Sequence, residues 1–241
     1  MEEPISVEQP AEPILYSPPS ANQTFAALRH RNFQLYFGGQ LVSNIGTWTQ
    51  IIAQGWVVYQ LGHSELILGL VAFASALPTL IVSPWAGVIV DRVSRRHLLM
   101  LTQAGSMLLA FVLAILSFSG AVKEWHVVIL AALLGVINAF DAPARQAFVP
   151  DMVGKDDIPN AIALNSLMFN SARVLGPALA GLLLVLVGAG WCFTINGFSF
   201  LAVILGLWLM KIPARQVTHN IGSPWEQLVG GVRYTARSRE M

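Results

Sequence analysis

The sequence predicts an all-α membrane protein with six transmembrane helices. Hydrophobic residues make up 55% of the 241 residues and charged residues only 11%, whereas a typical soluble chain carries about 25% charged residues. The charges are also unevenly placed and leave long stretches with none. A soluble protein of this size could not cover its surface with 14 basic and 13 acidic residues.

Six segments are long enough to cross the hydrocarbon core of a bilayer, which takes about 20 apolar residues. We expect these segments near residues 33–60, 66–90, 97–121, 125–148, 161–188 and 191–210. Several of the connections between them are very short, so consecutive segments are expected to be antiparallel neighbours.

The basic residues predict the orientation of the six segments, because cytosolic loops of membrane proteins are enriched in Lys and Arg. Twelve of the 14 basic residues fall on one side, whereas Lys123 lies alone on the other and Arg173 lies within the fifth segment. Both termini are therefore predicted to be cytosolic. The twelve are Arg29, Arg31, Arg92, Arg95, Arg96, Arg145, Lys155, Lys211, Arg215, Arg233, Arg237 and Arg239.

The two ends of the chain differ in composition from the apolar part. Residues 1–24 hold four glutamates and five prolines without an apolar run, which predicts a disordered cytosolic tail rather than a secretory signal. Residues 25–210 are expected to form the six-helix bundle. Residues 211–241 are more polar, and within them 225–239 predict an amphipathic helix at the cytosolic leaflet.

The first segment carries many amide and hydroxyl side chains for a membrane helix. They recur at spacings of three and four, and at 100° per residue they fall within an arc of roughly 120°. Lipid offers them no hydrogen-bond partner, so this face must meet protein or water. We expect it to line a water-filled substrate cavity; hydrogen bonding between packed helices is the alternative. The residues are Gln40, Ser43, Asn44, Thr47, Gln50 and Gln54, with Asn138, Asn165, Asn170 and Asn196 as further candidates.

A charged string follows the second segment and reads Gly87-x-x-x-Asp91-Arg92-x-Ser94-Arg95-Arg96. Its arginines fit the orientation rule, but an acidic residue beside the bilayer is costly unless it is paired. A carboxylate there can cap a helix N-terminus and hold a cationic partner. We therefore predict a breakable conformational latch at Asp91.

Two further charged positions lie inside the apolar part. Asp141 and Arg145 are four residues apart at the end of the fourth segment, so they can pair along one helical face. Arg173 falls within the helical pattern of the fifth segment, and a buried arginine in a membrane bundle points to function. The alternative is that the fifth segment enters the membrane only after Arg173, which leaves the guanidinium at the interface.

Proline and glycine mark two of the segments. Pro78 and Pro84 lie in the second, and Gly176-Pro177 followed by Gly181 lies in the fifth. Proline bends a helix, and glycine allows close helix contact. The residues predict either bent helices that rock against a neighbouring bundle or static packing.

Several classes of function lack support. A net charge of +1 gives no field for nucleic acid, and Cys192 as the one cysteine excludes an intramolecular disulfide and a CxxC site. No HExxH, GxGxxG, GxxxxGK or GxSxG element occurs. Serines within the apolar segments have no intramembrane histidine near them in sequence. We therefore expect no enzyme activity, no metal and no cofactor.

These motifs resemble a known family. The string from Gly87 to Arg96 is similar to the loop signature GxxxDRxGRR of the major facilitator superfamily, with Ser94 in place of the usual glycine. Gly176-Pro177 and Gly181 resemble the fifth-helix motif of the drug:proton antiporter branch. Leu77-Pro78, the stretch 143–150 and Asn165-Ser166 resemble the bacterial branch that contains enterobactin and macrolide exporters. The likeness extends over residues 25–241.

The resemblance implies an N-terminal half of a twelve-helix transporter that works by alternating access in the plasma (inner) membrane. It makes Asp91 a latch against Arg145 and the companion half, and the polar face of the first segment part of the substrate cavity. It implies proton-driven export of a small amphipathic molecule, drug or siderophore, with the proton gradient as driving force. Residues 211–241 then begin the central cytosolic linker, and Asp141 is the candidate proton site of this half.

The number of predicted segments is half of the twelve that the family has. Six segments make one half of such a transporter, so the chain is a fragment, a truncated reading frame or a half that pairs with another chain. A homodimer of two such halves is not favoured. The competing function is a non-transporting membrane subunit or remnant.

Overall fold

The computed structural model describes residues 25–211. All regular structure in this range is helical, which confirms the predicted all-α class. Six long helices are present, and their ends differ from the predicted segments by three residues at most. They are α2 (Arg31–Gly62), α3 (Glu65–Arg92), α4 (Arg95–Phe118), α5 (Glu124–Phe148), α6 (Ile158–Leu186) and α7 (Ala189–Leu209), with the short 3₁₀ helices η1 (Ala26–Arg29), η2 (Val149–Asp151) and η3 (Lys155–Asp157). The predicted tail and amphipathic helix lie outside the described residues.

Short reversals join consecutive helices. At the end of α2, His63 takes the left-handed conformation with φ 47°, and its N–H donates to the carbonyl oxygen of Tyr59 at 2.8 Å. Gly188 lies between α6 and α7 with φ 87°, a value that residues with a side chain rarely adopt. These two connections reverse the chain within two residues, so the helices they join run antiparallel.

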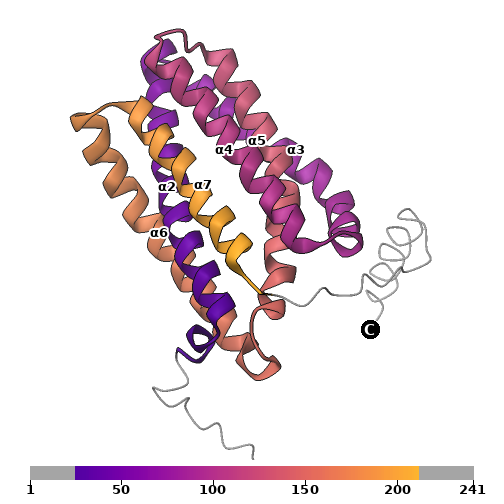
Figure 1. Cartoon of the computed structure of the whole chain (residues 1–241). Coiled ribbons are helices and arrows are strands. Elements are labelled where there is room, and N and C mark those ends of the chain that lie inside the picture. Colours follow the sequence, from indigo (N-terminus) through magenta and orange to yellow (C-terminus); the bar gives the residue numbers. More distant parts are fainter. Residues whose placement is uncertain (1–24, 212–241) are drawn as a thin grey trace, which may run out of the picture.

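The helices do not pack in chain order. Across the bundle the sequence of neighbours is α6, α2, α7, α4, α5 and α3 (Figure 1). The main contacts are α3 with α5, α5 with α4, α4 with α7, α7 with α2, and α2 with α6. Helices α2, α3 and α4 correspond in packing to α5, α6 and α7. The contact of α3 with α5 then corresponds to that of α6 with α2, and the contact of α2 with α7 to that of α5 with α4. The bundle is therefore built from two three-helix groups that pack in the same way.

Two glycines bring helices into close contact. A β-carbon at Gly135 of α5 would collide with the backbone oxygen of Ser75, and one at Gly176 of α6 would collide with Cβ of Trp48. The Thr79 hydroxyl donates to the carbonyl oxygen of Gly135 at 2.8 Å, and that of Thr49 donates to Gly176 at 3.2 Å. Helices that touch through small residues and hydroxyls hold together in lipid, where no hydrophobic force joins them.

A buried polar layer separates two apolar clusters inside the bundle. One cluster includes Phe33, Phe148 and Leu207, and the other includes Val58 and Phe193. Along α2, α4 and α7, the buried polar side chains fall between the residues of the two clusters. The layer consists of Gln40, Ser43, Asn44, Thr49, Gln50, Thr102, Gln103, Ser106, Asp141, Asn196 and Ser199.

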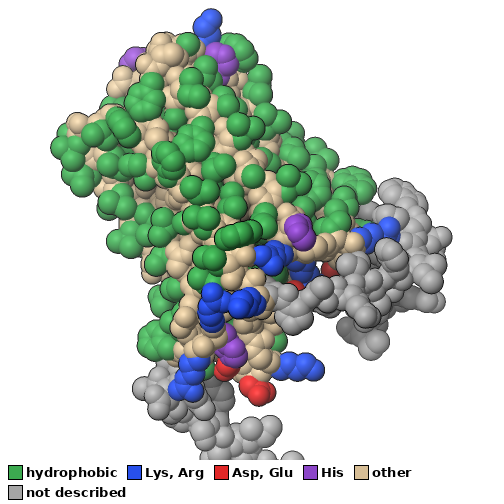
Figure 2. Space-filling model, viewed as in Figure 1, with side chains coloured by type: hydrophobic (Ala, Val, Ile, Leu, Met, Phe, Trp, Pro, Cys, Tyr) green, Lys and Arg blue, Asp and Glu red, His purple; other side chains and the backbone are tan. Residues whose placement is uncertain are grey.

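The outside of the bundle is largely apolar. Figure 2 shows hydrophobic side chains over most of one face, with most of the charged side chains of that face at its lower end. Within residues 25–211, five helices are long and apolar enough to cross a membrane: α3, α4, α5 with η2, α6 with η3, and α7. Helix α2 is long enough at 32 residues but more polar, since it supplies five members of the buried polar layer.

Candidate functional site

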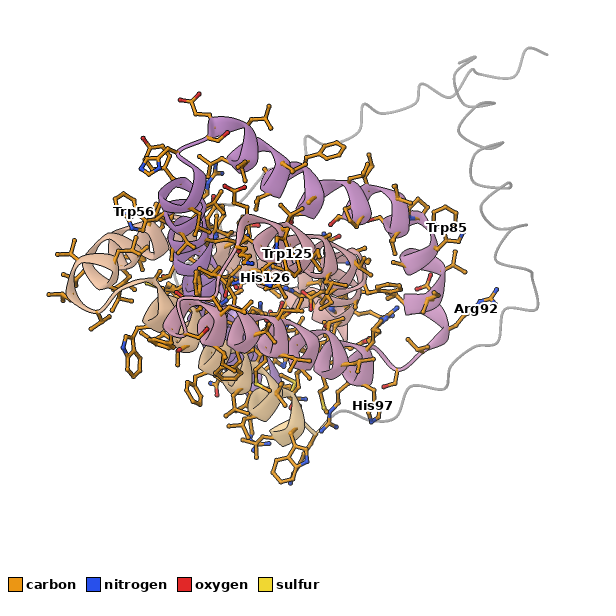
Figure 3. The ribbon with its side chains drawn as sticks, turned by 90° about the horizontal axis from the view of Figure 1, so that it is seen from above. Trp56, Trp85, Arg92, His97, Trp125 and His126 are labelled. Atoms are coloured by element: carbon orange, nitrogen blue, oxygen red, sulfur yellow. The ribbon has the colours of Figure 1, made fainter. Side chains whose placement is uncertain are left out.

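The charged string joins α3 to α4 at the charged end of the bundle, and Figure 3 shows Arg92 and His97 beside this connection. Arg95 holds the start of α4 against the end of α5. Its Nη1 donates to the carbonyl oxygen of Ala147 at 2.7 Å and to Oδ2 of Asp151 at 3.0 Å. Nη2 of Arg96 donates to the carbonyl oxygen of Trp208 at 2.9 Å and so connects α4 to α7. Both arginines therefore stabilise contacts within the bundle.

The predicted latch residue has a different environment. The side chain of Asp91 is 76% exposed, and its Oδ1 lies 3.8 Å from Nη2 of Arg95. The structure does not bring Asp91 to Arg145. Four residues earlier, a β-carbon at Gly87 would meet no atom of another helix within 4 Å. The latch role of Asp91, and a partner for it in the companion half, therefore stay predictions.

Asp141 and Arg145 form the expected ion pair along α5. The Asp141 carboxylate is buried, and its Oδ1 also accepts hydrogen bonds from the Thr102 hydroxyl and the Gln103 amide, each at 2.8 Å. The pair thereby ties α5 to α4. Sequence reasoning missed Thr102, Gln103 and Asp151; two adjacent polar residues in the largely apolar third segment were a usable signal for the first two.

The polar face predicted on α2 lies largely inside the bundle. Gln40 and Asn44 bond to each other at 3.3 Å, and the Asn196 amide of α7 donates to Oε1 of Gln50 at 2.8 Å. The bond between Gln50 and Asn196 is a helix–helix contact of the kind given as the alternative to a cavity. Ser43 is also buried, Thr47 and Gln54 are half-buried, and Asn138 of α5 is exposed.

The glycine–proline motif and Arg173 lie on α6. Helices α3 and α6 continue through their prolines, and Gly176 packs against α2, whereas Gly181 is exposed. The expectation that Arg173 is buried is not met within the six helices, since its side chain is exposed. The preceding residue, Ala172, is buried, and one step of about 100° moves Arg173 from the packed face of α6 to its exposed edge, where its guanidinium lies beside Trp48 of α2.

The sequence also matches a known protein family. Residues 22–241 match the model of the major facilitator family described as transmembrane secretion effector. The chain belongs to the major facilitator superfamily. This confirms the resemblance carried by the string from Gly87 to Arg96, and with the apolar helices it makes the chain a multi-pass membrane protein.

Several curated transporters are similar to this superfamily member. The staphyloferrin A transporter of Staphylococcus aureus (strain NCTC 8325 / PS 47) is 33% identical over 174 residues, which is 71% of this chain and 44% of the relative. The multidrug efflux pump Tap of Mycolicibacterium fortuitum is 27% identical over 71% of this chain and 43% of the pump. Macrolide efflux protein A of Streptococcus pyogenes is 28% identical over 64% and 39%. The alignments cover less than half the length of these relatives.

Proposed function

We propose that this chain forms the N-terminal six-helix half of an exporter that moves small amphipathic molecules out of the cell in exchange for protons. The observation that carries the proposal is the similarity to named drug and siderophore transporters along less than half of their length. The partner is then a second six-helix half, in the same chain or another. We place the protein in the plasma (inner) membrane with both ends of the 241 residues cytosolic.

Alternating access requires that the half moves as one body, and the contacts support this. Arg95, Arg96 and the Asp141–Arg145 pair connect α4, α5 and α7 at the charged end. The glycine contacts hold α3 to α5 and α2 to α6 farther along the helices.

The exposed carboxylate of Asp91 is then available to the second half. We propose that it forms a contact that exists in one state of the transporter and breaks in the other. Asp141 is the candidate in this half for the coupling proton, and no cofactor is needed because the proton gradient supplies the free energy.

The test uses everted membrane vesicles that contain the full gene product with these 241 residues. Uptake of ethidium, a radiolabelled macrolide and staphyloferrin A is measured with a proton gradient and again after a protonophore collapses it. We expect gradient-dependent uptake of at least one compound, and no uptake by the 241 residues expressed alone. Absence of uptake of all three by the full product would favour a non-transporting subunit instead.

A further inference from the structure

Two stripes of opposite character lie on the exposed surface of α6. One stripe, which we call the α6 polar stripe, consists of Ser166, Asn170 and Arg173. At about 100° per residue these three fall within an arc of about 60°, and all are exposed in the bundle. The other stripe is apolar and equally exposed: Leu167, Val174, Ala178, Leu182 and Val185.

Only the apolar stripe is suited to lipid. An amide, a hydroxyl and a guanidinium have no hydrogen-bond partners in the hydrocarbon core, and a charged side chain there is strongly unfavourable. The α6 polar stripe therefore faces water or another part of the transporter, while the apolar stripe on the other side of the helix meets the lipid.

Arg173 is far from either end of its helix. It is the sixteenth of the 29 residues of Ile158–Leu186, about 22 Å along the axis from Ile158 at 1.5 Å per residue. Since the hydrocarbon core is about 30 Å thick, Arg173 lies near its middle when α6 crosses it. This depth places the guanidinium well inside the membrane rather than at the headgroup interface.

The surroundings of Arg173 combine a positive charge with an aromatic surface. Its guanidinium carbon lies 5.6 Å from the ring centroid of Trp48, and the Trp48 ring meets Phe169 edge to face at 5.9 Å. The ion pairs found within residues 25–211 involve His30, Asp91, Arg95, Asp141, Arg145, Asp151 and Asp157, and Arg173 is not among them. Among the described residues, the Arg173 charge thus has no acidic partner, and it lies over the Trp48 ring.

We propose that Arg173 binds the anionic group of an amphipathic organic substrate, such as a carboxylate. The planar guanidinium can donate two parallel hydrogen bonds to a carboxylate. Asn170 and Ser166 supply further hydrogen bonds along the same stripe, and Trp48 and Phe169 pack against the apolar body of the molecule. This inference rests on the proposed transport function and specifies its substrate class as organic anions.

The test compares two ligands that differ in one charge: dansyl-phenylalanine and its uncharged amide. Each is titrated into the full gene product in lipid nanodiscs, with energy transfer from tryptophan to dansyl as the signal and empty nanodiscs as the blank. The variants are Arg173→Gln and Arg173→Lys. Arg31→Gln is the matched control, because it removes the same charge from an exposed position at the start of α2.

We expect Arg173→Gln to weaken binding of the acid by about tenfold to a hundredfold, the effect of one charge-assisted hydrogen-bonding group, and to leave the amide unchanged. Arg173→Lys should keep part of the preference for the acid, and Arg31→Gln all of it. Equal loss for both ligands, or no loss for either, would overturn the proposal; equal loss indicates that Arg173 pairs with a carboxylate of the second half.

A second measurement leaves Arg173 in place and so does not depend on folding of the variants. A cysteine at position 170 (Asn170→Cys) in a cysteine-free background is labelled with a water-soluble maleimide. The acid should slow labelling at concentrations at which the amide does not; equal protection by both contradicts the inference. If transport occurs without any preference for the acid, the inference fails and the proposed function stands, whereas absence of all transport removes the function itself.

Discussion

The buried polar layer and the α6 polar stripe are two polar regions of the same membrane bundle, one buried between helices and the other exposed on the surface of the bundle. In the layer, Gln50 of α2 and Asn196 of α7 bond to each other and are almost fully enclosed. In the stripe, Asn170 and Arg173 point out of the six helices. Neither set can form hydrogen bonds with lipid. Packing within the six helices supplies hydrogen-bond partners to the buried layer, whereas the stripe needs partners from water, a substrate or another chain segment. Polarity on a membrane helix therefore indicates what the face avoids rather than what it binds.

The largest expected effect concerns the contact that positions α6 beside Trp48. Gly176→Ala adds a β-carbon that collides with Cβ of Trp48, so α2 and α6 must separate. We expect a loss of about 1–3 kcal/mol in the free energy of unfolding, typical of overpacking. Gly181→Ala is the matched control on the same helix, because its added carbon meets no atom of another helix within 4 Å. Thermal unfolding in detergent measures the stability of both variants. Equal unfolding midpoints would contradict a stabilising close contact between Gly176 and Trp48.

The next effect separates contacts inside the half from contacts beyond it. Asp91→Asn leaves the helix contacts intact, because the carboxylate is 76% exposed. We expect export to fall about tenfold, equivalent to about 1.4 kcal/mol, with unchanged insertion and thermal stability. Arg95→Gln should instead lower stability, since Arg95 holds the carbonyl of Ala147 and the carboxylate of Asp151. Full transport by Asp91→Asn contradicts the latch.

The smallest effect probes the buried polar layer. Gln50→Leu leaves the Asn196 amide unpaired, and helix–helix hydrogen bonds in membranes contribute about 0.6 kcal/mol on average. We expect a stability loss of this size and an unchanged set of transported compounds. The double variant Gln50→Leu with Asn196→Leu should recover much of the loss, because both partners are then apolar. A changed substrate profile would show that Gln50 lines the cavity, as its sequence pattern first suggested.

The sequence was sufficient to predict the helices but not their neighbours. Apolar runs of about 20 residues and short polar connections located all six, since each property depends on nearby residues alone. Which helices touch depends on distant pairs such as Gly176 with Trp48, and no local pattern specifies them. The Asp141–Arg145 pair was predictable from its spacing of four, whereas the bonds of Asp141 to Thr102 and Gln103 cross between helices.

The polar faces show the same limit. Helical periodicity groups four of the five buried polar residues of α2 and misses Thr49. It does not say whether α7 or a cavity lies opposite them. For Arg173, the pattern located the charge within a helix but did not predict its exposure within the six helices, because exposure depends on how α6 is rotated relative to its neighbours. The comparison with known transporters identified the family, which the string around Asp91 had already indicated.

One measurement tests the contrast between the two polar regions most directly. Cys192 is buried. Removing it, together with any other cysteine of the full gene product, gives a background without reactive thiols. Into this background we introduce Ser43→Cys and Ser166→Cys, the same change in the buried polar layer and in the α6 polar stripe. Unsealed membranes are treated with a membrane-impermeant maleimide. We predict that the cysteine at position 166 reacts and that the one at position 43 reacts only after denaturation. Equally fast labelling at position 43 would contradict the account, because the α2 face would then line an open aqueous cavity.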